Sequence, residues 1–285
     1  MKIPFKIDLK SKTAVVTGGA GELCGRFSEA LAECGANVAI LDLRKDVADN
    51  LAKKINENGG TAIGIEANVL DLKSLYEAEN IIKKEFGLCT ILINGAGGNH
   101  PKGTTSKEFL NIDDLKNEEK DLITFFDLDQ QGIEFVFDLN FIGTLLPTQV
   151  FAKHMINQKG SIIINISSMN AFKPLTRIPA YSGAKAAVSN FTQWLAVHFS
   201  KVGIRVNAIA PGFFLTEQNR ALLTNKDGSF TKRAERILDH TPAGRFGKPR
   251  ELLGTLLWLA DEEASGFVNG IIIPVDGGFS AYSGV

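Results

Sequence analysis

The sequence of 285 residues predicts an α/β fold in which a doubly wound, mostly parallel sheet is covered by helices on both faces. Short apolar runs rich in Val, Ile and Leu recur along the chain, and amphipathic stretches lie between them. Apolar runs without polar alternation are typical of strands that are buried on both faces of a parallel sheet. Because strand and helix alternate from end to end, we expect right-handed β-α-β units with ligands at the carboxyl ends of the strands.

Seven apolar runs are the candidate strands, and they predict a seven-stranded sheet. They lie at 13–18, 36–42, 62–69, 90–97, 161–168, 204–212 and 270–278. Between them, apolar residues at helical spacing, with Gly at several of the stops, predict helices over 26–35, 46–60, 74–87 and 181–203. No convincing break divides this pattern, so we expect a single domain over residues 1–285.

The segment 99–137 interrupts the alternation. It is polar, charged and weakly periodic, and it is longer than an ordinary connection between a strand and a helix. We expect an insertion near the mouth of the active site, partly helical or folded as a short hairpin.

Composition excludes several classes of function. Hydrophobic residues make up 44% of the chain, and 31 Lys and Arg against 32 Asp and Glu leave a net charge of -1. This balance provides no basic field for nucleic acid or an anionic membrane. The chain contains no run of eighteen apolar residues and no apolar signal core near Met1. We therefore expect a cytoplasmic protein without a membrane span.

Cysteine and histidine do not predict a metal site or a disulfide. The three cysteines, Cys24, Cys34 and Cys89, form no CxxC pair, and an odd number of thiols argues against a disulfide framework. The four histidines are scattered without metal-ligand spacing. Buried reduced thiols and structural or surface histidines are the expected outcome.

A glycine-rich turn after the first predicted strand is suited to a dinucleotide. The segment from Thr17 to Gly25, TGGAGELCG, runs directly into a helix. Glycines such as Gly18, Gly19 and Gly21 allow a tight turn and close approach of the backbone, and the helix N-terminus presents N–H groups to a pyrophosphate. This is the local arrangement of a Rossmann-like fold.

Asp42 lies 17 residues after Gly25, at the end of the second predicted strand. A carboxylate at this position can accept hydrogen bonds from the ribose hydroxyls of NAD. Arg44 and Lys45 follow closely and could instead meet the 2′-phosphate of NADP. NAD is therefore the preferred cofactor, with NADP as the alternative.

Four residues form a candidate catalytic set: Asn140, Ser168, Tyr181 and Lys185. Tyr181 and Lys185 are four residues apart in a predicted helix, so both project from one face. A nearby ammonium favours the phenolate, whose ordinary pKa of about 10 is too high for a base at neutral pH. Ser168 ends a strand, where its hydroxyl can donate to a substrate oxygen beside Tyr181.

In this order, these motifs resemble the classical short-chain dehydrogenase/reductase family over nearly the whole chain. The resemblance also includes Asn94-Gly95-Ala96-Gly97 and Pro211-Gly212, and Ser168 stands thirteen residues before Tyr181. It implies that Tyr181 is the acid/base, that Lys185 lowers its pKa and holds the nicotinamide ribose, that Ser168 orients the substrate oxygen and that Asn140 completes a proton relay. The cofactor-binding residues that it implies are Thr17, Gly18, Gly19, Gly21, Leu23, Asp42, Asn68, Val69, Asn94, Ala96, Gly97, Tyr181, Lys185, Pro211, Gly212 and Phe214.

The chain departs from the family pattern at three positions. In the usual TGxxxGxG, Glu22 and Cys24 replace the second and third glycines. A glutamate that pointed inward would repel a pyrophosphate, so we expect Glu22 to point outward. Gly95 replaces the second Asn of the family's NNAG motif.

Several unusual segments resemble the D-mannonate oxidoreductase (fructuronate reductase) branch of this family. They include GGNHPKGTT at 97–105, LLPTQVFAK at 145–153 and PGFFLTEQNRALL at 211–223. The resemblance implies interconversion of D-fructuronate and D-mannonate, in which the substrate is a polyhydroxy acid. It also implies a homo-oligomer, commonly a tetramer. Polar residues around the expected pocket are the candidates for substrate binding: His100, Lys102, Asn170, Arg177, Gln218, Asn219 and Arg220.

Two other functional classes remain open. The first is another polyol or sugar dehydrogenase or a 3-oxoacyl reductase. The second is a non-catalytic protein that senses a dinucleotide or acts as a scaffold. The complete set of Ser168, Tyr181 and Lys185 argues against the second class, because a sensor needs no acid/base pair.

Overall fold

A computed structural model describes residues 7–116, 121–216, 220 and 223–284. Seven strands form one sheet in the order β3-β2-β1-β4-β5-β6-β7, and every neighbouring pair is parallel. This confirms the predicted seven-stranded α/β sheet. The strands are β1 (Thr13–Thr17), β2 (Asn37–Asp42), β3 (Thr61–Glu66), β4 (Ile91–Asn94), β5 (Ser161–Ile166), β6 (Ile204–Pro211) and β7 (Ile272–Val275).

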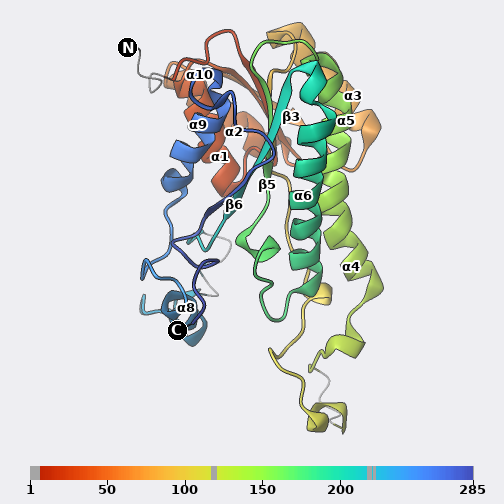
Figure 1. The fold of residues 1–285 in the computed structure, drawn as a ribbon, viewed down its shortest axis with the longest axis vertical. Coiled ribbons are helices and arrows are strands. Elements are labelled where there is room, and N and C mark those ends of the chain that lie inside the picture. Colours follow the sequence, from red (N-terminus) through yellow and green to blue (C-terminus); the bar gives the residue numbers. More distant parts are fainter. Residues whose placement is uncertain (1–6, 117–120, 217–219, 221–222, 285) are drawn as a thin grey trace.

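Helices cover both faces of the sheet (Figure 1). The described helices are α1 (Glu22–Glu33), α2 (Lys45–Glu57), α3 (Leu72–Phe86), α4 (Gln130–Phe137), α5 (Gly143–Met155), α6 (Pro179–His198), α8 (Lys232–Asp239), α9 (Leu253–Ala260) and α10 (Glu262–Ser265). Helices α1, α2 and α9 pack on one face, and α3, α5 and α6 pack on the other. The chain therefore winds over both faces, as the alternation of strands and helices predicts.

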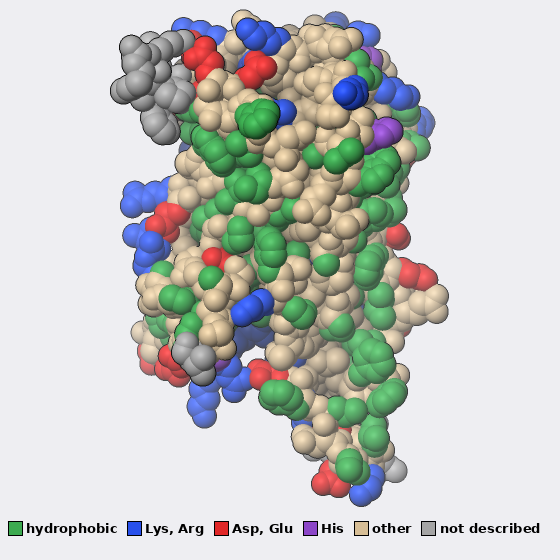
Figure 2. All heavy atoms as spheres, in the orientation of Figure 1, with side chains coloured by type: hydrophobic (Ala, Val, Ile, Leu, Met, Phe, Trp, Pro, Cys, Tyr) green, Lys and Arg blue, Asp and Glu red, His purple; other side chains and the backbone are tan. Residues whose placement is uncertain are grey.

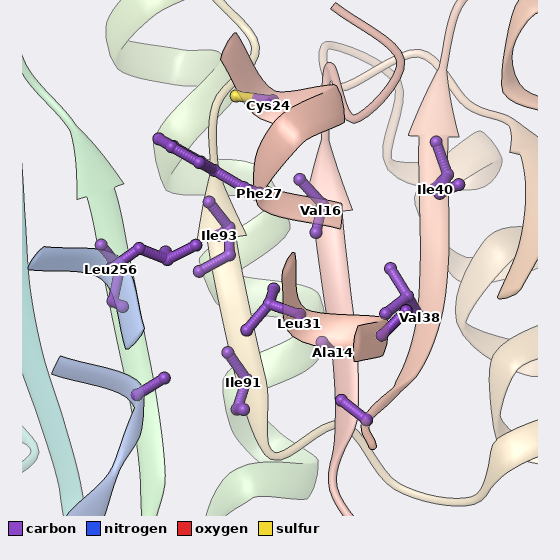
Figure 3. Packing of buried hydrophobic residues seen from close by; sticks show 14 of the residues in the cluster. Ala14, Val16, Cys24, Phe27, Leu31, Val38, Ile40, Ile91, Ile93 and Leu256 are labelled. Atoms are coloured by element: carbon purple, nitrogen blue, oxygen red, sulfur yellow. The ribbon is translucent and has the colours of Figure 1, made fainter. Parts of the chain in front are cut away.

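The central strands are buried on both faces, which explains their continuous apolar sequence. On the first face, Phe27 and Leu31 of α1 and Leu256 of α9 lie against the strands, with Ile93 of β4 beside them (Figure 3). Burial of a side chain of this size contributes about 1.5–3 kcal/mol. This packing orients the start of α1 toward the carboxyl end of β1.

The helical run from Gln130 to Met155 is long and apolar enough to cross a membrane by length and composition alone. Half of its most apolar stretch is buried inside the molecule, and residues of α5 belong to the core beneath the sheet. We assign it to the core of the protein.

The segment 99–137 extends from the body of the molecule as an arm (Figure 1). Its described residues contain three short 3₁₀ turns, at Pro101–Gly103, Ile112–Lys116 and Phe125–Asp127, before α4 begins. At the stem, the Ser106 amide donates to the Ile123 carbonyl at 2.8 Å, and the Ile123 amide donates to Ser106 Oγ at 2.9 Å. The helical content agrees with the expectation, and no strand occurs in the described part of the arm.

Candidate active site

The glycine turn between β1 and α1 is shaped by close backbone contacts. Gly18 has a φ of 59°, and a Cβ there would lie 3.0 Å from the Ala96 Cα. Gly21 is the N-cap of α1 and contributes no capping side chain, so it does not occupy the first N–H groups of the helix. Glu22 is exposed, as predicted. Such a turn fits a pyrophosphate, because backbone donors and the helix dipole favour an anion.

Thr17 connects this turn to the loop after β4. Its Oγ1 accepts hydrogen bonds from the amides of Gly95 at 3.1 Å and Ala96 at 3.2 Å. Gly97 follows, and a Cβ there would lie 2.7 Å from Asn140 Oδ1 and 3.1 Å from Lys185 Nζ. Only a glycine therefore lets these two predicted catalytic side chains approach the loop.

Two departures from the family pattern are in contact with each other. A Cβ on Gly95 would overlap the Cys24 sulfur and would lie 2.9 Å from the Thr17 carbonyl oxygen. Cys24 is buried, and burial raises the pKa of its thiol to about 12. The Cys24 side chain thus occupies the space that a side chain at position 95 would need.

The residues predicted to bind adenosine lie after β2 and β3, at the carboxyl edge of the sheet. Asp42 ends β2, and its Oδ1 accepts a hydrogen bond from the Arg44 amide at 3.2 Å. Asn68 follows β3, and its Oδ1 accepts from the Leu70 amide at 3.0 Å. Val69 is buried beside Gly143 at the start of α5. The first two contacts are local to their own loops, and the third joins the loop after β3 to the start of α5.

Asn140 is fully buried in a π-helical turn, Asp138–Ile142, between α4 and α5. Its Nδ2 donates to the carbonyls of Gly98 and Val136, both at 2.7 Å, and its Oδ1 accepts from the Gly98 amide at 3.3 Å. π-Helical turns inside helices frequently occur at functional sites. This one directs the Asn140 amide toward the loop after β4.

Lys185 and Tyr181 occupy one face of α6, which begins at Pro179. The buried Lys185 Nζ donates to the Ile166 carbonyl at 2.8 Å and lies 5.7 Å from the centre of the Tyr181 ring. Burial lowers the pKa of Lys185 to about 8. Ser168, after β5, makes a side-chain hydrogen bond with Tyr181.

The pKa of Tyr181 differs from the sequence-based expectation. Burial raises it above its ordinary value, and the hydrogen bond with Ser168 opposes this rise. The expected lowering by Lys185 is not seen, and the ammonium donates instead to the Ile166 carbonyl. The phenol is therefore a proton donor at neutral pH.

A buried polar ladder crosses the sheet at the level of the site, and the sequence analysis did not predict its partners. Asn94 Nδ2 donates to Thr148 Oγ1 at 3.0 Å and to Asn165 Oδ1 at 2.9 Å. Asn165 Nδ2 in turn donates to Thr192 Oγ1 at 2.9 Å. The ladder joins α5, β4, β5 and α6. Of its residues only Asn94 belongs to a recognisable motif.

Of the other predicted cofactor residues, Pro211 ends β6, Gly212 and Phe214 follow it, and Leu23 lies in α1. The Gly212 amide donates to the Val275 carbonyl at 3.0 Å, and a Cβ on Gly212 would overlap the Asp276 backbone. Phe214 is buried against Gly247. Leu23 is half-buried in the first turn of α1.

The predicted substrate residues have different surroundings. His100 Nδ1 accepts from the Lys102 amide at 3.2 Å, and Lys102 pairs with Asp129 at 3.7 Å, so both support the arm. Asn170 is buried close to Ser168, and its Oδ1 has no partner among the described residues. Arg177 immediately precedes α6. Gln218 and Asn219 lie outside the described residues, and Arg220 is exposed.

Within the described ranges, no three His, Cys, Asp or Glu side chains gather as a metal site. The cysteines Cys24, Cys34 and Cys89 are all free thiols. The predicted catalytic side chains Tyr181, Lys185, Ser168 and Asn140 lie close to the glycine turn and the loop after β4.

The family model for short chain dehydrogenases matches residues 12–227, a range that contains the glycine turn and all four of these side chains. The chain belongs to the short-chain dehydrogenase family. The matched range ends before α8, so the C-terminal helices and β7 lie beyond it.

Two relatives and one solved structure are similar to this short-chain dehydrogenase over nearly its whole length. It is 52% identical over 283 residues to the uncharacterized oxidoreductase UxuB of Bacillus subtilis (strain 168), covering 99% of this chain and 100% of that protein. It is 30% identical over 272 residues to 5-keto-D-gluconate 5-reductase of Escherichia coli (strain K12), covering 95% and 96%. A crystal structure with bound NAD, of a protein from Haemophilus influenza proposed to be a D-mannonate oxidoreductase, is 59% identical and superposes with a TM-score of 0.93, covering 98% of each chain.

Proposed function

We propose that this short-chain dehydrogenase transfers a hydride between NAD(H) and a six-carbon sugar acid, interconverting D-fructuronate and D-mannonate. The observation that carries the proposal is the convergence of Asn140 and Lys185 on Gly97, with Tyr181 and Ser168 joined beside them. An acid/base pair beside a dinucleotide cradle fits hydride transfer to a ketone.

The proposed roles follow from the hydrogen-bonding groups. In ketone reduction, the substrate oxygen accepts hydrogen bonds from Ser168 and Tyr181 and takes its proton from Tyr181. Lys185 and Asn140 then help to return a proton to Tyr181 through water. NAD(H), when bound, supplies or accepts the hydride. The raised pKa of Tyr181 is consistent with a proton donor that keeps its proton until the substrate oxygen becomes negatively charged.

NAD is proposed over NADP because Asp42 ends β2 at the adenosine side of the cradle. Its carboxylate would accept from ribose hydroxyls and repel a 2′-phosphate. The similar crystal structure holds NAD, which supports this preference. Lys45 pairs with Asp49 at 2.5 Å, so its charge is already partly balanced.

The substrate class is supported by the relatives. The reductase of Escherichia coli is named for 5-keto-D-gluconate, and the Haemophilus protein is proposed to act on D-mannonate. In both 5-keto-D-gluconate and D-fructuronate, the ketone is the fifth carbon counted from the carboxylate. This shared geometry also makes a 5-keto-D-gluconate reductase the second candidate function.

The proposal is tested by following NADH oxidation with D-fructuronate, 5-keto-D-gluconate and fructose, and by repeating the assay with NADPH. We expect D-fructuronate with NADH to give the highest kcat/KM. Equal kcat/KM for D-fructuronate and fructose would contradict the sugar-acid assignment, and a clear preference for NADPH would contradict the role of Asp42.

The cellular setting is proposed on similar grounds. The nearly balanced charge and the burial of the longest apolar helical run favour a cytoplasmic enzyme without nucleic-acid or membrane partners. The exposed Trp194 ring, stacked between the half-buried Phe191 and the exposed His198 on α6, favours a homo-oligomer, which we propose is a tetramer.

A further inference from the structure

Arg177 is held in an unusual backbone conformation where the segment before α6 meets the stem of the arm. Its φ of 74° lies in the left-handed region, which costs a side-chain-bearing residue about 1–2 kcal/mol. The Thr105 amide donates to the Arg177 carbonyl at 2.8 Å, and Arg177 Nε donates to the Thr105 carbonyl at 2.8 Å. Among the described residues, the two terminal nitrogens of the guanidinium have no hydrogen-bond partner, although they carry four N–H donors.

Two arginines of α8, Arg236 and Arg233, lie near the same stem. Arg236 forms an ion pair with Glu108, which fixes one side of α8 against the stem three residues from Thr105. Arg233 lies three residues before Arg236 and therefore on the same side of the helix. It has no ion pair or hydrogen bond within the described part of the chain, and it stands in the first turn of α8, where a positive charge opposes the helix dipole.

The two guanidinium groups influence each other. Partial burial lowers the pKa of Arg233, the charge of Arg177 lowers it further, and Glu108 raises it. Since Glu108 is already paired with Arg236, its carboxylate offsets the charge of Arg233 only in part. Figure 2 shows Lys and Arg side chains near α8, with Asp and Glu side chains beside them. The region has an excess of positive charge that an anionic ligand would offset.

We propose that Arg177 and Arg233 form a carboxylate-binding site that holds the acid end of the sugar-acid substrate. This assignment rests on the proposed function. Arg177 lies four residues before Tyr181, a separation of at most about 14 Å along the chain. Their two side chains and a six-carbon acid can bridge that length, with the ketone at Tyr181 and the carboxylate at the arginines. Terminal N–H groups of a guanidinium bind a carboxylate in a two-pronged arrangement.

This site explains how a neutral sugar is discriminated from its acid. A carboxylate leaving water needs charged partners, and the arginines are left without a charged partner when a hydroxymethyl group stands in its place. His100 and Lys102 are less suited as anchors, because both already support the arm. Arg233 was not among the residues predicted from the sequence.

The test measures binding without turnover. D-Mannonate and NADH are both reduced, so calorimetric titration of the enzyme–NADH complex with D-mannonate reports affinity alone. We expect Arg177→Met and Arg233→Met each to weaken D-mannonate binding at least ten-fold, and the double variant about a hundred-fold. Arg177→Lys keeps the charge but loses the two-pronged guanidinium, so its affinity for D-mannonate should lie between those of wild type and Arg177→Met. NADH affinity should stay unchanged in all of them, which shows that the fold is kept.

The matched control is Lys232→Met, which removes one positive charge from the exposed neighbour of Arg233. It should leave D-mannonate affinity within two-fold of wild type. Unchanged affinity in the double variant, equal losses in Lys232→Met, or no D-mannonate binding to wild type would each overturn the carboxylate site. Failure of the proposed function has a different signature: D-mannonate binds through the arginines, but D-fructuronate is not reduced.

Discussion

The four predicted catalytic residues come from three separate parts of the chain, and two of them reach the loop after β4. Asn140 and Lys185 meet at Gly97, and Tyr181 meets Ser168. Burial disfavours the charged form of both titratable groups. It raises the pKa of the Tyr181 phenol, which stays protonated, and lowers the pKa of the Lys185 ammonium, which loses its proton more easily. Both shifts favour neutral forms in the cofactor-free protein.

Tyr181→Phe should retain the fold and NADH binding and lower turnover by about 10²–10⁴, the usual loss of a general acid. Removing one hydroxyl leaves little space behind. Steady-state rates with the preferred ketone, together with NADH fluorescence titration, provide the measurement. Near-normal turnover in the Phe variant would mean that another group donates the proton.

Cys24 and Gly95 should behave as an energetically coupled pair. Gly95→Ala places a methyl group on the Cys24 sulfur and should destabilise the protein by about 1–3 kcal/mol. Cys24→Gly should relieve part of this loss, because the Thr17 carbonyl remains close to the new methyl group. A double-mutant cycle by urea unfolding should give a coupling free energy of at least about 1 kcal/mol.

Gly98→Ala is the control for this pair, because its methyl group would meet only Leu139 at an ordinary 3.6 Å. Gly98→Ala should cost less than Gly95→Ala and should show no coupling with Cys24→Gly. Strictly additive effects of Gly95→Ala and Cys24→Gly would contradict the contact.

Lys185→Met should make cofactor-free protein more stable than wild type by an amount that depends on pH. The Lys185 pKa falls from 10.5 to about 8 on folding, so burying the ammonium costs up to about 3 kcal/mol below pH 8. As pH rises from 8 to 10.5, the folded protein releases this proton before the unfolded chain does, and wild type regains stability. The Met variant cannot do so.

The advantage of Lys185→Met in free energy of unfolding should therefore be largest below pH 8 and shrink toward pH 10. The raised pKa of Tyr181 lowers stability only above its unfolded value near pH 10, and this effect is common to both proteins. Urea unfolding at several pH values measures the difference. A difference that stays constant from pH 7 to 10 would show that the ammonium is not destabilised by burial.

At the scale of elements, the carboxyl edge of the sheet is held by polar contacts inside the core. The ladder from Thr148 through Asn94 and Asn165 to Thr192 joins two strands to two helices. Ser167 adds a contact between β5 and α6, since its Oγ donates to the Lys185 carbonyl at 3.2 Å. Buried networks of this kind restrict a core to one arrangement, although Asn94 Oδ1 has no partner among the described residues.

Thr192→Val should test the ladder, because it keeps the side-chain shape and removes the acceptor of Asn165 Nδ2. A buried donor left without a partner costs about 1–3 kcal/mol. The control is Thr255→Val in α9, where the threonine is only half-buried and makes no side-chain hydrogen bond to the described residues. Thermal unfolding that is equally affected by both changes would argue against the ladder.

At the scale of the whole molecule, an apolar surface runs along α6 and its neighbours. The Trp194 ring stacks on Phe191 at 6.1 Å and on His198 at 4.5 Å between ring centres. Trp194 is 55% exposed and Val197 is 77% exposed. Figure 2 also shows hydrophobic side chains down the side that carries α4 and α5. A surface of this kind is typical of a subunit contact.

Trp194→Glu should convert the proposed tetramer to a smaller species, because a charge in an apolar contact loses its hydration. Sedimentation velocity gives the mass of each species. Lys53→Glu, which places the same side chain on α2 at the opposite face of the sheet, is the control. A monomeric wild-type protein would refute the tetramer.

Much of the fold is determined by local patterns in the sequence. The seven apolar runs contain or overlap the seven strands, because a strand buried on both faces needs continuous apolar residues. The ends of the strands and helices were harder to predict. The run at 90–97 forms a strand only over Ile91–Asn94, because the amides of Gly95 and Ala96 donate to Thr17 Oγ1. The helix predicted over 26–35 begins instead at Glu22, because Gly21 caps it.

The tertiary structure decided which distant residues share a site. Motif spacing identified Tyr181 and Lys185, because one helix turn separates them. Spacing along the chain could not identify the partners of Asn94, the overlap of Cys24 with position 95 or the approach of Arg233 to Arg177. These contacts depend on the strand order and on how α8 and the arm pack, and both are set by burial summed over the whole chain rather than by any local pattern.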